Sequence, residues 1–156
     1  MPEERSLIIM KPDALQRGLV GSILHRFERK GLKIIGLKMV ELEDLIIDEH
    51  YAHHKDKPFF SSLKHYMKST PVILLALSGV HAIQAIRLIV GPTRGYEADA
   101  GSIRGDFAMS GQSNIVHASD SAESAEQEIK RFFKPHELFD YQKPDFPWLY
   151  SDSVLE

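Results

Sequence analysis

The residue with the clearest chemical potential lies at the end of an apolar stretch in the C-terminal half. The segment "NIVHASDS" (114–121) runs from Ile115 and Val116 into His117, and small residues follow. A neutral imidazole is a good nucleophile near pH 7 because its unperturbed pKa is about 6.5. Such a ring needs one nitrogen exposed and the other held by an acceptor. Glu128 is a candidate acceptor, as is any backbone carbonyl, and a structural histidine at a strand end is the alternative.

Several cations stand where they could approach this histidine. Lys11 directly follows an apolar segment, Arg87 lies in the last turn of a predicted helix, and a long loop carries Arg94 and Arg104. A solvated strand end would explain Lys11, and Arg87 could complement its helix dipole, worth about 0.3–1 kcal/mol. Three cations converging on His117 would suit a polyphosphate. Neither GxxxxGK[ST] nor GxGxxG occurs, so spacing alone leaves phosphoryl transfer as one hypothesis among several.

The stretch "HYAHHKDKPFF" (50–60) offers two further kinds of chemistry. Four residues of metal-binding type recur there at helical spacing: His50, His53, His54 and Asp56. They could bind a metal ion, although clustered surface histidines are a common alternative. Tyr51 and the pair Phe59-Phe60 are either buried core or, in the functional interpretation, a platform on which a base stacks.

Alternating strands and helices must position these residues. The hydrophobic patterns predict strands at 6–10, 32–42, 72–77 and 113–118, and helices around Leu19–Phe27, within 44–69 as two short helices, at 81–90 and at 122–133. Two βαβ-type units in this order indicate an α/β fold, the ferredoxin-like sandwich, in which helices cover one face of a four-stranded antiparallel sheet. We expect a single domain over 1–156, with residues 139–156 as a C-terminal extension.

One segment departs from this alternation. The stretch 91–111 carries five glycines and no sustained periodicity. Loops of this length inside a compact domain are usually functional or disordered. Since the strand that ends in His117 follows, the loop is a candidate source of ligand contacts.

Composition excludes several classes of protein. The 156 residues suit one domain, and the absence of cysteine excludes disulfides, thiolate zinc sites and a cysteine nucleophile. No apolar run approaches the roughly 18 residues of a membrane span, and the first ten residues lack the pattern of a secretory signal. A net charge of −3 argues against bulk attraction to nucleic acid. We therefore expect a soluble, cytoplasmic protein.

Five segments together resemble one enzyme family. They are "MKPDA" (10–14), "HYAHHKDKPFF" (50–60), "VGPT" (90–93), "IRGDF" (103–107) and "NIVHASDS" (114–121). Their order and approximate spacing resemble those of the nucleoside diphosphate kinases, over roughly residues 4 to 150. The resemblance implies transfer of the γ-phosphate of a nucleoside triphosphate, usually ATP, to nucleoside diphosphates. It implies a ping-pong reaction through a phosphohistidine, which maintains nucleoside triphosphate pools.

The resemblance also implies roles for individual residues. His117 matches the nucleophile, and Ser119 and Glu128 match residues that orient its ring. The positions that match phosphate- and ribose-binding residues are Lys11, Tyr51, Arg87, Thr93, Arg104 and Asn114. Among them, Arg87, Thr93 and Arg104 would hold phosphates, while Lys11 and Asn114 would reach the ribose 3′-hydroxyl. Phe59 matches the ring that stacks on the base, and Mg²⁺ would arrive on the nucleotide phosphates without a dedicated protein site.

Three segments depart from the family's pattern. Gly111-Gln112-Ser113 replaces an apolar residue, a glycine and an arginine, which puts the second wall of the base site in question. The stretch 93–101 replaces a more proline-rich segment that shapes subunit contacts. Ala118 stands where many members have glycine. None of these changes affects the matched nucleophile or cations.

The remaining alternatives concern assembly and class. The tail 140–156 carries Phe146, Trp148, Leu149 and Tyr150, which would pack on their own subunit or on a neighbour. Longer tails go with hexamers in this family, so we expect a homo-hexamer, with a tetramer as the alternative. A non-catalytic relative would be expected to lose Lys11, Arg104 or His117. A nucleic-acid-binding domain would want aromatic residues on its central strands.

Overall fold

The computed structural model describes residues 2–152. Its strands are β1 (Glu4–Met10), β2 (Lys33–Val40), β3 (Val72–Gly79) and β4 (Val116–Ala118). Its α-helices are α1 (Pro12–Gln16), α2 (Val20–Lys30), α3 (Asp44–His50), α4 (Phe60–Met67), α5 (Ala82–Val90), α6 (Ile103–Phe107), α7 (Ala122–Phe132) and α8 (Phe146–Leu149). Short 3₁₀ turns lie at Ala52–His54, Gly95–Glu97 and Pro135–Glu137.

The four strands form one antiparallel sheet in the order β2-β3-β1-β4. The two central strands are almost wholly buried, as expected for the apolar runs "SLIIM" and "VILLAL". The order places β1 beside β4, so that Ile9 pairs with His117. The predicted ferredoxin-like α/β class is therefore confirmed, and its connectivity brings the nucleophile candidate to the strand that precedes Lys11.

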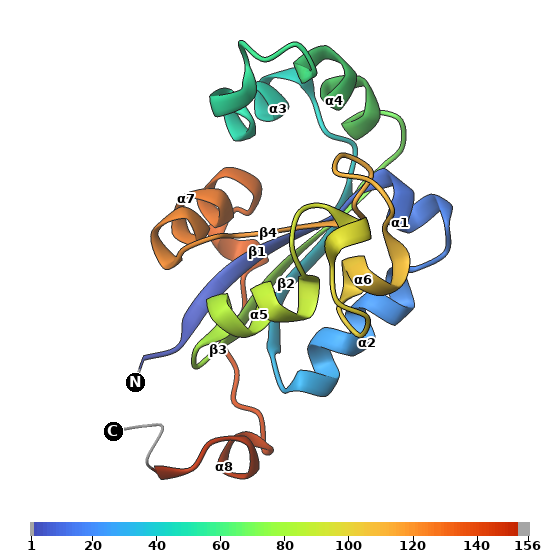
Figure 1. Ribbon diagram of the computed structural model, residues 1–156. Coiled ribbons are helices and arrows are strands. Elements are labelled where there is room, and N and C mark those ends of the chain that lie inside the picture. Colours follow the sequence, from blue (N-terminus) through green and yellow to red (C-terminus); the bar gives the residue numbers. More distant parts are fainter. Residues whose placement is uncertain (1, 153–156) are drawn as a thin grey trace.

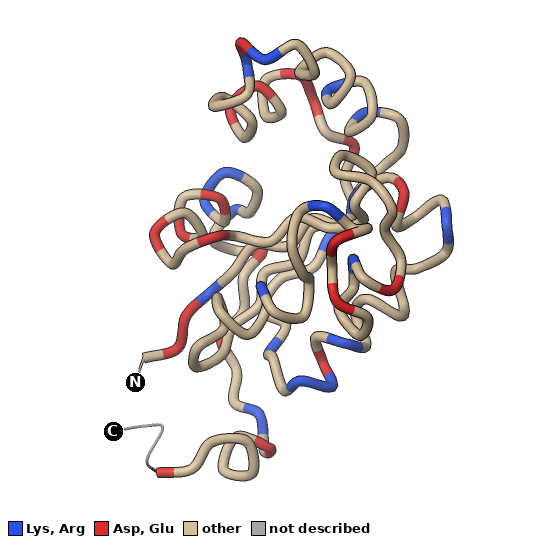
Figure 2. The backbone as a smooth tube through the Cα atoms, viewed as in Figure 1, with Lys and Arg blue, Asp and Glu red and all other residues tan. Residues whose placement is uncertain are grey.

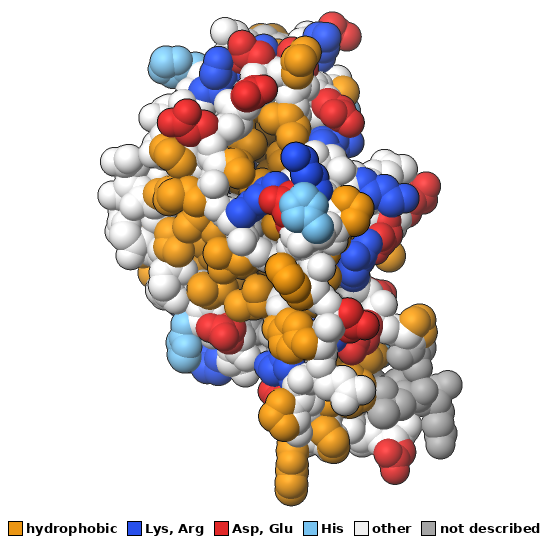
Figure 3. All heavy atoms as spheres, turned by 180° about the vertical axis from the view of Figure 1, so that it is seen from behind, with side chains coloured by type: hydrophobic (Ala, Val, Ile, Leu, Met, Phe, Trp, Pro, Cys, Tyr) orange, Lys and Arg blue, Asp and Glu red, His pale blue; other side chains and the backbone are white. Residues whose placement is uncertain are grey.

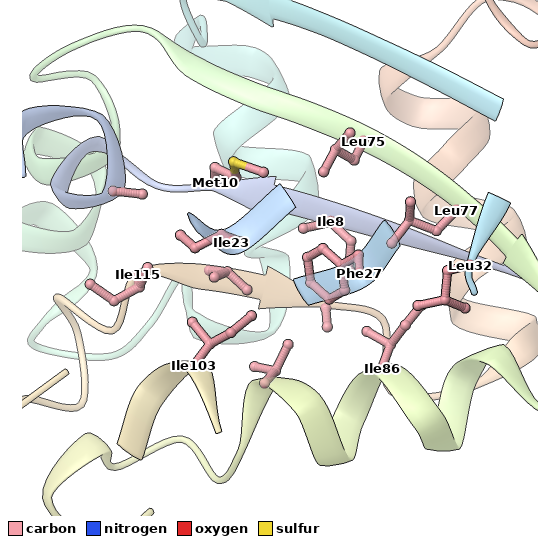
Figure 4. Packing of buried hydrophobic residues seen from close by; sticks show 14 of the residues in the cluster. Ile8, Met10, Ile23, Phe27, Leu32, Leu75, Leu77, Ile86, Ile103 and Ile115 are labelled. Carbon is pink, nitrogen blue, oxygen red and sulfur yellow. The ribbon is translucent and has the colours of Figure 1, made fainter. Parts of the chain in front are cut away.

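Helices cover both faces of the sheet, so the expectation of one covered face was wrong. One core packs Ile8, Met10 and Leu75 against α2 and α5, with Phe27 and Ile86 fully buried (Figure 4). The other core packs the alternate residues of the central strands, such as Leu7 and Leu74, against α3, α4 and α7. Figure 1 shows α7 and α5 on opposite sides of the sheet. Successive side chains of a fully buried strand point to opposite faces, so such strands need a cover on each.

The fourth strand is shorter than predicted because the backbone turns sharply before it. Ile115 has φ 77°, and the amide of Val116 donates to the carbonyl of Asn114 at 2.9 Å. This is a three-residue γ-turn with a positive φ at a β-branched residue, a conformation that costs roughly 1–3 kcal/mol. Two bonds hold it: the Ile115 amide donates to the Asp13 carboxylate at 3.1 Å, and its carbonyl accepts from the Lys11 amide at 2.8 Å.

The C-terminal tail lies against its own chain as far as the structure describes it. The amide of Phe139 donates to the carbonyl of Ile35 at 2.8 Å, and the amide of Val80 donates to the Tyr150 hydroxyl at 3.1 Å. Trp148, in contrast, is 91% exposed. The last four residues of the predicted extension lie outside the described residues.

Acidic and basic positions are both spread over the backbone trace (Figure 2), in keeping with the small net charge of −3. In the described chain, none of the helices combines the length and the hydropathy that a membrane crossing requires.

Candidate active site

A cleft of about 980 Å³ opens between the α3–α4 region, β4 and α7. Nine of the ten site residues expected from the sequence line it: Lys11, Tyr51, Phe59, Arg87, Thr93, Arg104, Asn114, His117 and Glu128. The tenth, Ser119, is fully buried behind the cleft wall. The cation Arg94 is not among the residues that line the cleft; its side chain is 64% exposed and pairs with Glu97 at 3.5 Å.

His117 points to the sheet face that α7 and α3 cover, because it pairs with Ile9, whose side chain belongs to that core. Its side chain is 23% exposed, and Nε2 bonds the Glu128 carboxylate of α7. Ser119 supports the same carboxylate, since its Oγ lies 3.4 Å from Glu128 Oε1 and accepts from the Leu7 amide at 3.0 Å. With Nε2 engaged, Nδ1 is the ring nitrogen left for chemistry.

The electrostatics keep this imidazole neutral. Burial, followed by the charges of Lys11, Arg104 and Arg87, lowers the pKa of His117 to about 3. Burial also raises the pKa of Glu128 above its ordinary value, although the neighbouring positive groups oppose this. At neutral pH the Nε2–H of the ring therefore donates a hydrogen bond to the Glu128 carboxylate, and Nδ1 keeps a free lone pair.

Lys11 and Asn114 form a buried polar pair at the floor of the cleft. Lys11 is the residue before α1, where the chain leaves β1, and its Nζ donates to Asn114 Oδ1 at 2.7 Å. Burial and the charge of Arg104, partly offset by Asp13, lower the pKa of Lys11 to about 7. The Asn114 amide donates in turn to the carbonyls of Thr93 and Gly111 at 2.9 and 3.0 Å. This pair joins the first strand, the long loop and the histidine segment.

Arg104 is buried, and backbone carbonyls fix its side chain. Its guanidinium donates to the carbonyls of Asn114, Gly91 and Val116 at 3.2, 3.0 and 2.6 Å, and the residue is 5% exposed. Burial, with a smaller effect of Arg87, lowers its pKa to about 10. Since a guanidinium carries five N–H donors, two remain available after these three bonds. Arg104 thus braces both sides of the γ-turn while lining the cleft.

Three other lining residues make few hydrogen bonds within the described chain. Arg87 is exposed, and among the described residues its side chain hydrogen-bonds the Ala118 carbonyl alone, at 3.4 Å. The hydroxyl of Tyr51 is buried and has no hydrogen-bond partner within the described chain. Phe59, at the N-terminus of α4, is 44% exposed with its ring 5.1 Å from that of His54. An arginine, a hydroxyl and an aromatic ring thus face the same space.

The suggested metal cluster of four residues does not form. Helix α3 ends at His50 and a 3₁₀ turn follows, so His53, His54 and Asp56 do not continue its face. Within residues 2–152, the group of metal-ligand type is instead His50, His117 and Glu128. The same cations that lower the pKa of His117 surround this group, so it suits an anionic ligand better than a metal cation.

Two residues of the site were not identified as such from the sequence. His50 was considered only as a metal ligand, yet its ring centroid lies 4.7 Å from that of His117. Arg131 was not considered, although it lines the cleft and bonds His50. Its position three residues after Glu128 places both on one helix face, which is the signal that could have identified it.

Comparison with known proteins bears on this arrangement. The family model described as nucleoside diphosphate kinase matches residues 4–138. A nucleoside diphosphate kinase of Parabacteroides distasonis is 53% identical over 96% of this chain and 97% of its own length. One from Pyrococcus horikoshii is 46% identical, with 97% and 98% covered.

Solved structures agree with the sequence relatives. A nucleoside diphosphate kinase of Halobacterium salinarum, in complex with CDP, superposes with a TM-score of 0.93 at 38% identity, covering 96% of this chain and 100% of that one. A nucleoside diphosphate kinase family protein of Babesia bovis gives 0.91 at 44% identity, covering 94% and 99%. With a cationic cleft built around a neutral histidine, and with these relatives covering nearly its whole length, the chain belongs to the nucleoside diphosphate kinase family.

Proposed function

We propose that this enzyme carries the phosphoryl group on Nδ1 of His117. The observation that carries the proposal is the bond between His117 Nε2 and Glu128, which leaves the Nδ1 lone pair facing the cleft. That lone pair attacks the γ-phosphorus of the nucleoside triphosphate. The bond from this phosphorus to the β–γ bridging oxygen breaks, and the nucleoside diphosphate leaves. A terminal oxygen of a second nucleoside diphosphate then attacks the same phosphorus, and the P–N bond breaks.

We assign Glu128 and Ser119 to orientation of the ring. While the P–N bond exists, the imidazole carries positive charge, which the carboxylate at Nε2 stabilises. The hydrogen bond from Ser119 keeps that carboxylate in place. A ring whose pKa is lowered to about 3 remains unprotonated, hence nucleophilic, at neutral pH.

The nucleotide phosphates are assigned to the side of the cleft that the two arginines line. Arg87, Thr93 and the two remaining donors of Arg104 would hold them, and the unpartnered hydroxyl of Tyr51 would donate to the transferring group. Lys11 and Asn114 would meet the ribose 3′-hydroxyl, with Lys11 also near the transferring phosphate. Mg²⁺ enters as part of the nucleotide substrate, where it neutralises phosphate charge.

The base is assigned to Phe59. A single exposed ring stacks on any base, so selectivity among bases should be broad. On this chain Gly111 offers no apolar side chain as a second wall, and a Cβ there would meet only Arg94 Cγ, at 4.0 Å. The relative from Halobacterium salinarum was solved with CDP, which supports a nucleoside diphosphate as ligand.

We also propose a homo-hexamer in the cytoplasm, with a tetramer as the alternative assembly. Apolar side chains gather on one face of the molecule (Figure 3). The exposed large apolar residues include Leu37 and Met39 on the edge strand β2, at 53% and 60% exposure. Exposed apolar side chains on an edge strand form a surface that a second copy can cover.

The test is phosphoenzyme formation from γ-labelled ATP. The wild-type chain should retain acid-labile label, and His117→Ala should retain none while still binding nucleotide, because the phosphate and ribose contacts come from other residues. His25→Ala, on the exposed face of α2, is the matched control and should label normally. Label at wild-type level on His117→Ala would place the nucleophile elsewhere.

A further inference from the structure

Arg131 joins α7 to the last turn of α3 beside the nucleophile. Its Nη1 lies 2.9 Å from His50 Nδ1, and its Nε lies 3.3 Å from Glu49 Oε1. The Arg131 side chain is 16% exposed, so most of it is packed between the two helices. A guanidinium can only donate, so His50 Nδ1 must accept and the proton of this neutral imidazole must reside on Nε2. One contact thus fixes the tautomer of a buried histidine.

The His50 ring is enclosed by other rings. Its centroid lies 4.7 Å from that of His117, 4.7 Å from that of Tyr51 and 5.0 Å from that of Phe132, each in an edge-to-face arrangement. His50 is 8% exposed. A ring confined on three sides and hydrogen-bonded at Nδ1 can neither flip nor tilt freely. The His50 ring supports the His117 ring, so the orientation of His117 depends on the contacts that fix His50.

The charges favour the same arrangement. A protonated His50 would place a second cation 2.9 Å from the Arg131 guanidinium and close to the nucleophile. Burial, followed by His117 and more weakly by Arg131 and Lys11, lowers the pKa of His50 to about 2 against the opposing effect of Glu128. The positive charge on this side of His117 therefore resides on Arg131, which the His50 ring separates from His117.

We propose that Arg131 is a positioning residue for phosphoryl transfer, acting through His50. By donating to His50 Nδ1 it fixes the tautomer and orientation of the ring that supports His117, and it tethers the turn that carries Tyr51. The inference rests on the proposed role of His117. It assigns Arg131 no contact with the transferring phosphoryl group.

The experiment compares Arg131→Leu with Lys130→Leu. Lys130 is the exposed neighbour on the same helix, so its variant removes the same charge without touching His50. The readouts are the single-turnover rate of His117 phosphorylation at saturating Mg-ATP, the melting temperature, and the ¹⁵N shifts of the His50 ring. We expect Arg131→Leu to phosphorylate about 10-fold more slowly or worse, since small misplacements of reacting groups are costly. Lys130→Leu should match the wild type.

The ¹⁵N shifts provide the readout that a merely structural role would not change. Wild-type His50 should show a protonated Nε2 and an unprotonated Nδ1, and Arg131→Leu should lose this preference. If Arg131→Leu does not fold, Arg131→Lys replaces it, because the ammonium keeps the charge but cannot place one planar group against both His50 Nδ1 and the Glu49 carboxylate. It should also be slow at a melting temperature near that of the wild type.

Each result decides the inference separately from the proposed function. A folded Arg131 variant that phosphorylates at the wild-type rate, or that loses only melting temperature, overturns the positioning role while His117 labelling stands. A wild-type chain that never labels refutes the proposed function instead. His50 shifts that are identical in wild type and variant would also overturn the inference.

Discussion

Replacing Lys11 by methionine should abolish activity and, near pH 7, make the free protein more stable. Lys11 is 7% exposed, and its pKa is lowered from the ordinary 10.5 to about 7, chiefly by burial. Since one pKa unit corresponds to about 1.4 kcal/mol, keeping the ammonium charged inside the fold costs at most about 5 kcal/mol. Methionine has a similar length and needs no solvation.

An opposing cost reduces the gain. Lys11 Nζ donates to Asn114 Oδ1 at 2.7 Å, and methionine leaves that buried oxygen without this donor. An unsatisfied buried acceptor costs about 1–3 kcal/mol. We therefore expect Lys11→Met to be more stable than the wild type by about 2 kcal/mol near pH 6–7.

The sign of this difference should change with pH. Unfolded Lys11 holds its proton up to pH 10.5, whereas folded Lys11 holds it only up to about 7. Between these values the unfolded chain binds more protons, so wild-type stability rises with pH relative to that of the variant. Near pH 10 most of the charge cost has vanished and only the loss at Asn114 remains, so Lys11→Met should be the less stable protein.

Urea unfolding at pH 6, 8 and 10 provides the measurement, because titrating groups that do not interact with Lys11 cancel in the difference between variant and wild type. Lys30→Met, at an exposed helix end, is the control and should show no such trend. A difference that stays constant from pH 6 to 10 would refute the claim that the buried ammonium is the source of the cost.

Three further predictions concern Arg87, Arg104 and the C-terminal tail. Arg87→Ala should lower kcat/KM by roughly 10² with an almost unchanged Tm, since the one hydrogen bond of its side chain within residues 2–152 is the long one to the Ala118 carbonyl. Arg104→Ala should lower both kcat/KM and Tm, because three backbone carbonyls lose their donor. Steady-state kinetics and thermal melts measure the two quantities. A variant that loses Tm but keeps kcat/KM would exclude Arg104 from the phosphate site. A form ending at Asp140 should unfold more easily, because it lacks the bond between the Val80 amide and the Tyr150 hydroxyl, and light scattering will report its assembly. A full-length tetramer, or an equally stable hexameric truncation, would contradict the role assigned to the tail.

Strongly patterned elements could be predicted from the sequence. The apolar runs of β1 and β3 identified the two central strands, and the apolar stripe 122–133 identified α7. Weak patterns could not: α6 has five residues, too few to show periodicity, so the stretch 91–111 was expected to be a loop. The γ-turn at Ile115 was also missed, because the bonds that stabilise it come from Lys11 and Asp13, far away in the sequence.

The candidate site was predicted mainly through motifs. The ten site residues implied by the resemblance all lie at or behind the cleft, whereas the resemblance implied no role for Arg131. Its role depends on how α7 and α3 pack, and side-chain spacing within one helix does not give the distance to another. For the same reason, the three carbonyls that Arg104 binds could not be inferred from its position in the chain.

The placement of β4 at the edge of the sheet has a consequence for synthesis and folding. Its partner is β1, so the pairing of Ile9 with His117 joins the first strand to be synthesised to the last one. During translation the first strand must wait for almost the whole polypeptide to leave the ribosome before it gains this neighbour. Contacts of such long sequence separation form slowly, since a large loop must close first. His117, the proposed nucleophile, can therefore take its place beside β1 only after β4 has been made, and a nascent chain that ends before β4 cannot hold the proposed site.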